Sequence, residues 1–81
     1  MVIVAFYIDE MNFRGVANST FQYALYNQKI LKNKSIIFYN KKNRRNIKEV
    51  LNKFKKRFKT FGISSFKEIE KRKIKNINFI Y

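Results

Sequence analysis

The polar residues best placed for chemistry follow the first apolar run of the chain, at residues 2–8. A carboxylate at this position can act as a base or bind sugar hydroxyls. An arginine can bind a phosphate or carboxylate through two hydrogen bonds. A glycine at the start of a helix lets backbone N–H groups approach a phosphate. The candidate substrate-binding residues are therefore Asp9, Glu10, Asn12, Arg14 and Gly15.

A simpler interpretation of the same loop is open. In this interpretation Gly15 only forms the turn, Asn12 or Asn18 caps the following helix, and the two carboxylates are solvated charges. Asp9 and Glu10 are adjacent, so on a strand they would point to opposite faces. The support for a catalytic carboxylate pair is correspondingly weak, and no catalytic residue is assigned.

Several classes of site are excluded by composition. The chain has no histidine and no cysteine, which removes a Ser–His triad and the usual zinc ligands. It contains neither the G-x-G-x-x-G dinucleotide fingerprint nor a Walker-type phosphate loop. We therefore expect no cofactor and no metal.

The charge of +14 in 81 residues invites a nucleic-acid interpretation. However, Lys, Asn, Ile, Phe and Tyr make up 49 of the 81 residues, and all five can be encoded by codons built only from A and T. Most of the charge lies in residues 41–81, which hold 15 basic and 3 acidic side chains. No RNA-recognition motif or zinc-finger spacing supports specific nucleic-acid binding, which we do not expect. The basic helix expected at 47–59 is a candidate for peripheral contact with an anionic membrane.

Apolar periodicity divides the chain into alternating strands and helices. Runs at residues 2–8, 35–39, 59–63 and 77–81 have strand length, and the first suits a strand buried on both faces. Helix-period patterns occupy about 16–31, 47–59 and 66–73. Asn33 is a candidate helix stop, Asn46 a candidate cap, and Ser65 with Glu68 matches a capping box.

This β-α-β-α-β-α-β order predicts an α/β fold with a Rossmann-like, three-layer half-domain spanning residues 1–81. We expect a parallel four-stranded sheet in the order 3-2-1-4 with three helices. One short helix cannot cover the second face of such a sheet, so that face should expose a sizeable apolar patch. We also expect such a chain to be poorly soluble or partly folded alone.

Residues 6–10, 12–20 and 23–25 resemble the start of a glycosyltransferase with two Rossmann-like domains, the GT-B type. Segments 34–39 and 58–66 also fall where such chains place later strands. The segment 14–20 is the most specific part. Arg14 stands where these enzymes often have one of two adjacent glycines.

The resemblance implies a family 4-like glycosyltransferase whose amino-terminal half faces the acceptor. The nucleotide-sugar donor would be held mainly by a carboxyl-terminal domain, which these residues do not include. We therefore expect a truncated part of a hexosyltransferase, inactive alone, that meets donor and acceptor only in a full-length protein. Two alternatives remain open, namely a small basic module binding nucleic acid or an anionic surface, and an α/β interaction domain without chemistry. No run reaches the roughly 20 apolar residues of a membrane span, and the expected location is cytoplasmic, peripheral to the membrane if the basic helix binds lipid.

Overall fold

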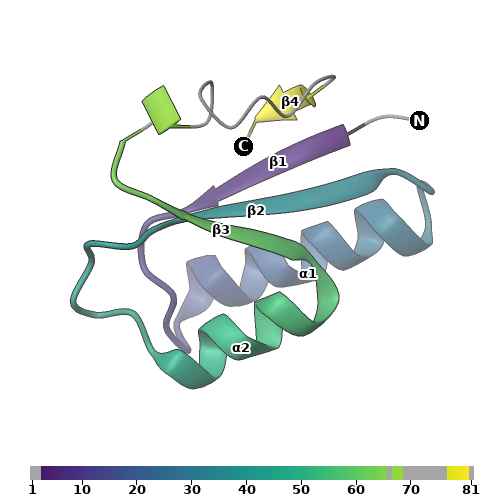
Figure 1. Ribbon diagram of the computed structural model, residues 1–81. Helices are drawn as coiled ribbons and strands as arrows, with labels where there is room; N and C mark the ends of the chain where they lie inside the picture. The colour runs from purple at the N-terminus through teal and green to yellow at the C-terminus, as the bar shows by residue number, and fades with distance from the viewer. Residues whose placement is uncertain (1–2, 66, 69–76, 81) are drawn as a thin grey trace.

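The protein is an α/β structure, seen in a computed structural model that describes residues 3–65, 67–68 and 77–80 (Figure 1). Strands and helices alternate through the first 63 residues, and one further strand follows. The elements are β1 (Ile3–Ile8), α1 (Gly15–Lys29), β2 (Lys34–Asn40), α2 (Lys48–Arg57), β3 (Lys59–Ile63) and β4 (Ile77–Ile80).

Parallel pairing holds the sheet together. β1 pairs with β2 from Ile3 opposite Lys34 to Ile8 opposite Tyr39. β2 pairs with β3 in the same direction, and β4 lies parallel to the other edge of β1 with a register shift after Ile3. The strands are ordered β3-β2-β1-β4, so β1 lies inside the sheet. The predicted α/β class with a parallel sheet is confirmed.

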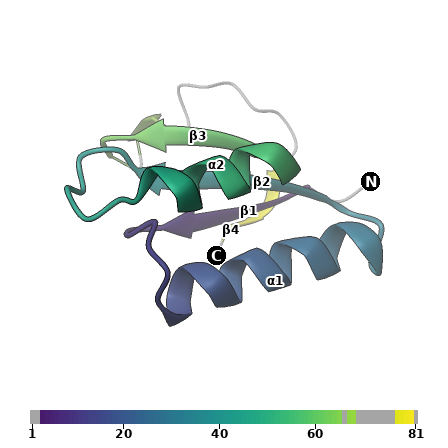
Figure 2. The ribbon, with the colours of Figure 1, turned by 90° about the horizontal axis from the view of Figure 1, so that it is seen from below.

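Helices α1 and α2 lie on the same face of the sheet (Figure 2). The ring of Phe21 on α1 contacts two rings from α2 and its end, Phe54 at 5.1 Å between centroids and Phe58 at 5.4 Å, both close to edge-to-face. This arrangement is the favourable one for aromatic pairs. The three rings form the centre of a core that also includes Val4, Phe6, Ile8, Ala17 and Val50.

The opposite face of the sheet does not show the apolar patch that we expected. Ala5, Ile36, Phe38 and Ile63 form a second buried cluster there, and none of the four exceeds 2% exposure. Their side chains alternate along β1 and β2 with those that face the helices, as a strand buried on both faces requires. On the described part of this face, the expectation of an exposed patch was wrong, and the expectation of poor solubility or partial folding loses the patch on which it rested.

A small polar network joins the end of α1 to the start of β2. The buried Asn27 side chain donates to Ser35 Oγ at 2.8 Å, and the Ser35 hydroxyl donates to the carbonyl of Ala24 at 2.9 Å. Asn33 donates in turn to Asn27 Oδ1 at 3.0 Å. Asn33 therefore stabilises the turn after α1. It is not the residue that ends the helix, because α1 already ends at Lys29. The chain reverses at Lys32, whose φ is +58°.

Two other predicted caps also differ from the structure. The N-cap of α2 is Ile47, whose aliphatic side chain makes no hydrogen bond, and the Asn46 side chain binds the Met11 N–H instead. The Glu68 carboxylate accepts a hydrogen bond from the backbone N–H of Ser64, not of Ser65. Most of the third helix predicted at 66–73 lies outside the described residues.

Candidate functional site

Two loops meet at the carboxyl edge of the sheet, residues 9–14 after β1 and residues 41–47 after β2 (Figure 1). They meet because β1 and β2 are adjacent and parallel, so both strands end at the same edge. In open parallel sheets this edge is where ligands bind. The candidate residues of the β1 loop therefore have a second loop as their neighbour.

Three asparagines at a spacing of three residues, which we call the asparagine tether, fasten the two loops together: Asn40, Asn43 and Asn46. Asn46 is the central member, since its Oδ1 accepts from the N–H of Met11 at 2.9 Å and its Nδ2 donates to the carbonyl of Asn40 at 2.8 Å. Asn43 donates to the carbonyl of Asp9 at 2.9 Å. A backbone bond of 2.6 Å from Ile47 N to Met11 O completes the tether.

The same asparagines shape the loop after β2. Asn40 Oδ1 accepts from the N–H of Lys42 at 3.1 Å, and Asn43 Oδ1 accepts from that of Arg45 at 2.9 Å. In the β1 loop, Asn12 accepts from the N–H of Arg14 at 2.9 Å. These are Asx turns, in which a side chain replaces a backbone turn. Asn12 therefore orders the entry to α1 from a position just before its N-cap, which is Arg14.

Both carboxylate oxygens of Glu10 interact with neighbouring side chains. One carboxylate oxygen accepts from Asn12 at 2.8 Å, and the other lies 3.5 Å from Arg45 Nη1. Arg45 is 79% exposed, so this ion pair adds no more than about 1 kcal/mol. The role that the geometry supports for Glu10 is to orient the loop.

Asp9 has a freer carboxylate. Its Oδ1 accepts from Asn40 at 3.0 Å and from the Tyr7 hydroxyl at 3.4 Å. No described residue hydrogen-bonds to its Oδ2. This oxygen can accept a hydrogen bond from a ligand hydroxyl. Burial raises the pKa of the Tyr7 hydroxyl, and the charge of Asp9 and its hydrogen bond raise that pKa further.

The raised pKa of Tyr7 predicts a pH effect on stability. The folded protein holds the Tyr7 proton more tightly than the unfolded chain, so this contribution is complete below the unfolded pKa of about 10 and is lost as the pH rises through the folded value. We expect the urea midpoint of the parent to fall more steeply above pH 10 than that of Tyr7→Phe. The two proteins differ only at position 7, so the difference in slope isolates this hydroxyl. Equal slopes would contradict the coupling.

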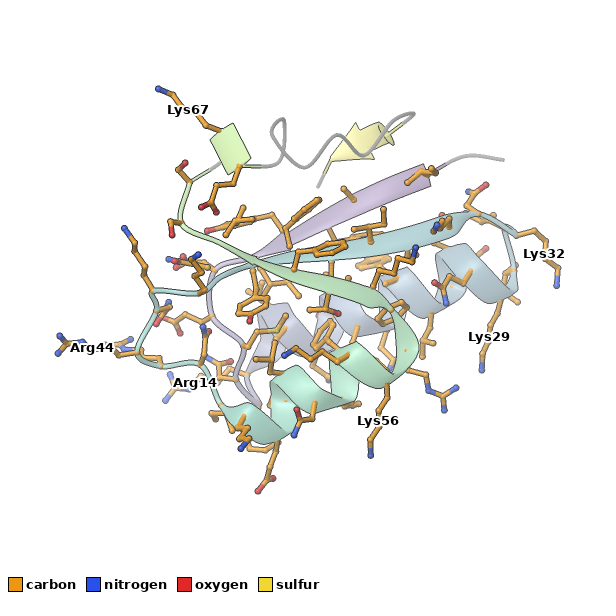
Figure 3. The ribbon with its side chains drawn as sticks, in the orientation of Figure 1. Arg14, Lys29, Lys32, Arg44, Lys56 and Lys67 are labelled. Carbon is orange, nitrogen blue, oxygen red and sulfur yellow. The ribbon has the colours of Figure 1, made fainter. Side chains whose placement is uncertain are left out.

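All five predicted site residues line one pocket of about 400 Å³ at this edge. The pocket is bounded by Asp9, Glu10, Asn12, Arg14, Gly15 and Val16. The Arg14 side chain is exposed, and no described residue pairs with its guanidinium (Figure 3). The five residues are near neighbours in the sequence, so their shared pocket follows from the chain itself, and their binding of a substrate stays a prediction.

Gly15 does not have the role of a turn glycine. No glycine in the described residues has positive φ, and a Cβ built on Gly15 meets nothing within 4 Å. The helix begins at this residue in ordinary conformation. A requirement for glycine here would therefore have to come from the close approach of a ligand.

Gly15→Ala tests that inference directly. Since the added methyl group meets open space, we expect the free energy of unfolding to stay unchanged or to rise by up to about 0.4–1 kcal/mol, because alanine restricts the unfolded chain. Urea unfolding measures the change. A loss of more than about 1 kcal/mol would show that Gly15 is needed by the fold itself.

The sequence alone did not reveal the asparagine tether or the contact of Arg45, since residues 40–45 were given no role and Asn46 only that of a candidate cap. A signal was present, because a parallel sheet with neighbouring first and second strands brings residues 40–46 beside the loop after β1. The regular spacing of Asn40, Asn43 and Asn46 was the second signal.

Metal-binding clusters and membrane-spanning helices are absent from the described residues. Within residues 3–65, 67–68 and 77–80, no group of three or more acidic side chains could hold a metal ion. No helix in the same part of the chain is long and apolar enough to cross a membrane.

The residues around the pocket can bind a polar ligand through Asp9 and Arg14, the first as a hydrogen-bond acceptor and the second as a cationic donor.

Comparisons with known proteins give no relative. No protein-family model matches this sequence, and no curated protein or solved structure shows significant similarity to it.

Proposed function

We propose that this chain is the amino-terminal, acceptor-side half of a GT-B type glycosyltransferase, with a Rossmann-like half-domain of four strands and three helices. The main support is that the predicted site residues share one pocket at the carboxyl edge of a parallel sheet. The resemblance of segment 14–20 to the first loop of such enzymes supplies the reaction class.

In this proposal Asp9 and Arg14 contact the ligand. Asp9 Oδ2 accepts a hydrogen bond from a sugar hydroxyl, and the Arg14 guanidinium binds an anionic group such as a phosphate or carboxylate. Glu10 and Asn12 hold the loop, because both side chains are used within it. No residue is assigned to proton transfer.

The donor is placed outside these residues. GT-B enzymes hold the nucleotide sugar mainly in a second domain, so residues 1–81 alone should show no sugar transfer. They should also not bind nucleotide sugars tightly, since the β1 loop has one glycine and no nucleotide fingerprint.

The proposal is tested by following backbone N–H signals by NMR while saccharides, and separately nucleotide sugars, are added to the 81-residue protein. We expect saccharides to shift signals of residues 9–16 and 40–46. Nucleotide sugars should give weak shifts at the same edge. Tight nucleotide-sugar binding, or saccharide shifts confined to α2, would contradict the proposal.

The second candidate is a basic module for nucleic acid or an anionic surface, favoured by the exposed cations of α2. Lys53, Lys55, Lys56 and Arg57 are all exposed, and three of them lie in its last turn, where cations also favour the helix dipole. This structural role accounts for them without a partner. We expect any nucleic-acid binding to be indifferent to sequence and lost near physiological salt, where the screening length is about 8 Å.

A further inference from the structure

The largest apolar side chains left exposed lie in one segment. Among the described residues, all six exposed large hydrophobics fall between positions 13 and 31, in α1 and its two ends. We call this set the α1 stripe: Phe13, Val16, Tyr23, Tyr26, Ile30 and Leu31, which are 52–73% exposed. Scattered exposed hydrophobics are ordinary, but a contiguous group marks an interaction surface.

The spacing along the helix places four of the six stripe residues on one side. Val16, Tyr23, Tyr26 and Ile30 follow one another at intervals of seven, three and four residues, which returns each to the same side of a helix. The buried residues Ala17, Phe21 and Ala24 occupy the side toward the sheet, and the buried Asn27 lies between the two sides. Helix α1 thus has two apolar sides, and the described residues cover only one.

Cations lie at both ends of the stripe, whereas the neighbouring carboxylates of Asp9, Glu10 and Glu49 lie only at its amino-terminal end, beside Val16 and Phe13. No acidic residue occurs from position 11 to position 48. Arg14 lies at the start of α1, and Lys29 and Lys32 lie at its end, where both lysine side chains extend into solvent (Figure 3). A second copy of the chain would bring another net charge of +14 against these cations, which opposes self-association. Charge complementarity therefore favours an anionic partner.

We propose that the α1 stripe docks on an anionic lipid bilayer. Tyrosines suit the boundary between head groups and acyl chains, because their rings are apolar and their hydroxyls are polar. Val16, Ile30 and Leu31 add apolar area to be buried, while lysines at the helix end extend to the phosphates. Each basic side chain near such a surface strengthens the binding.

This contact is distinct from the basic face of α2 and does not rest on the proposed sugar transfer. Among the described residues α2 exposes no large hydrophobic side chain. Attraction to its cations alone would disappear when salt screens the charges. Binding through the α1 stripe should weaken with salt but persist, because burial of apolar groups is not screened.

The absence of tryptophan from the chain makes the test direct. Tyr26→Trp places a fluorescent probe in the stripe, and Asn52→Trp places one on the exposed surface of α2. With vesicles of phosphatidylcholine and phosphatidylglycerol, we expect a blue shift for Tyr26→Trp and none for Asn52→Trp. Vesicles of phosphatidylcholine alone should give a smaller shift.

Substitutions within the α1 stripe test how much the stripe contributes to vesicle affinity. The substitutions Tyr23→Ser, Tyr26→Ser and Ile30→Ser together should lower vesicle binding in co-sedimentation at least about tenfold. The matched set Asn18→Ser, Gln22→Ser and Asn52→Ser, also at exposed positions, should change it less than about twofold. Circular dichroism checks that both sets remain folded.

Three results would overturn the proposal. The first is no binding to anionic vesicles at low salt. The second is equal binding by both variant sets, which would assign the contact to α2 or other cations. The third is a concentration-dependent dimer in analytical ultracentrifugation that the stripe substitutions abolish, without vesicle binding, which would assign the stripe to a second copy.

Discussion

Replacing Phe54 with alanine should lower the free energy of unfolding by about 3–5 kcal/mol, as expected for a phenylalanine removed from a packed core. Phe54 is 1% exposed and contacts both Phe21 and Phe58, so its loss leaves a cavity between the two helices and the sheet. Small domains have total stabilities of about 5–15 kcal/mol, so this variant should unfold at far lower urea concentration.

Phe13→Ala is the matched control, because the same atoms are removed from a side chain that is 69% exposed. We expect it to change the free energy of unfolding by less than about 0.5 kcal/mol. Urea unfolding followed by circular dichroism compares the two. A loss for Phe54→Ala below about 1 kcal/mol would contradict the core described above.

Asn46→Ala should cost about 2–3 kcal/mol, because it removes the central member of the asparagine tether. The substitution leaves the Met11 N–H and the Asn40 carbonyl without the partners that Asn46 supplies. Unsatisfied groups of this kind cost about 1–3 kcal/mol each when buried, and Asn46 is only half-buried, so water will replace part of the loss. The loop carrying Asp9 should also lose its fixed position.

Asn52→Ala serves as the control, since Asn52 is exposed on α2 and alanine favours helices. Amide hydrogen exchange should show faster exchange at Met11 and Ile47 in Asn46→Ala and unchanged exchange in the control. Exchange at these two amides equal to that of the parent would contradict the role given to Asn46.

The parallel α/β fold could be predicted because its signals are local. The run at residues 2–8 is apolar throughout, and β1 is indeed packed on both faces by two clusters. The stripe of Val50, Phe54 and Phe58 followed helical periodicity and is buried as expected. Such patterns depend only on which side chains avoid water.

The features that could not be predicted depend on partners far apart in the sequence. Asn46 looks like a helix cap from its neighbours, yet it binds Met11, 35 positions away. Arg45 on the other loop likewise approaches Glu10 from 35 positions away. Asparagine satisfies several geometries equally well, so only the tertiary structure decides between them.

The position of the pocket follows from the strand order, but the hydrogen bonds of its residues do not. The order of strands places the β1 loop, with Asp9 to Gly15, at the carboxyl edge of the sheet. Which carboxylate is already satisfied depends on side-chain contacts across two loops. Asp9 and Arg14 are the residues to test, because Asp9 Oδ2 and the Arg14 guanidinium have no hydrogen-bond partner among the described residues.

The central claim is that function resides in the β1 loop and not in the basic helix. Its most direct test is sugar transfer by the complete enzyme proposed above, carrying either Asp9→Asn with Arg14→Gln, or Lys55→Gln with Lys56→Gln and Arg57→Gln. Lys53 is left unchanged, because its ammonium lies 4.3 Å from the centre of the Phe21 ring and contributes to packing.

We expect the loop pair to lower kcat/KM at least about tenfold, and the helix set to leave it within about twofold of the parent. Thermal unfolding should show that both proteins remain folded. Loss of transfer in the helix set, with full activity in the loop pair, would contradict the account and make the cations of α2 the functional surface.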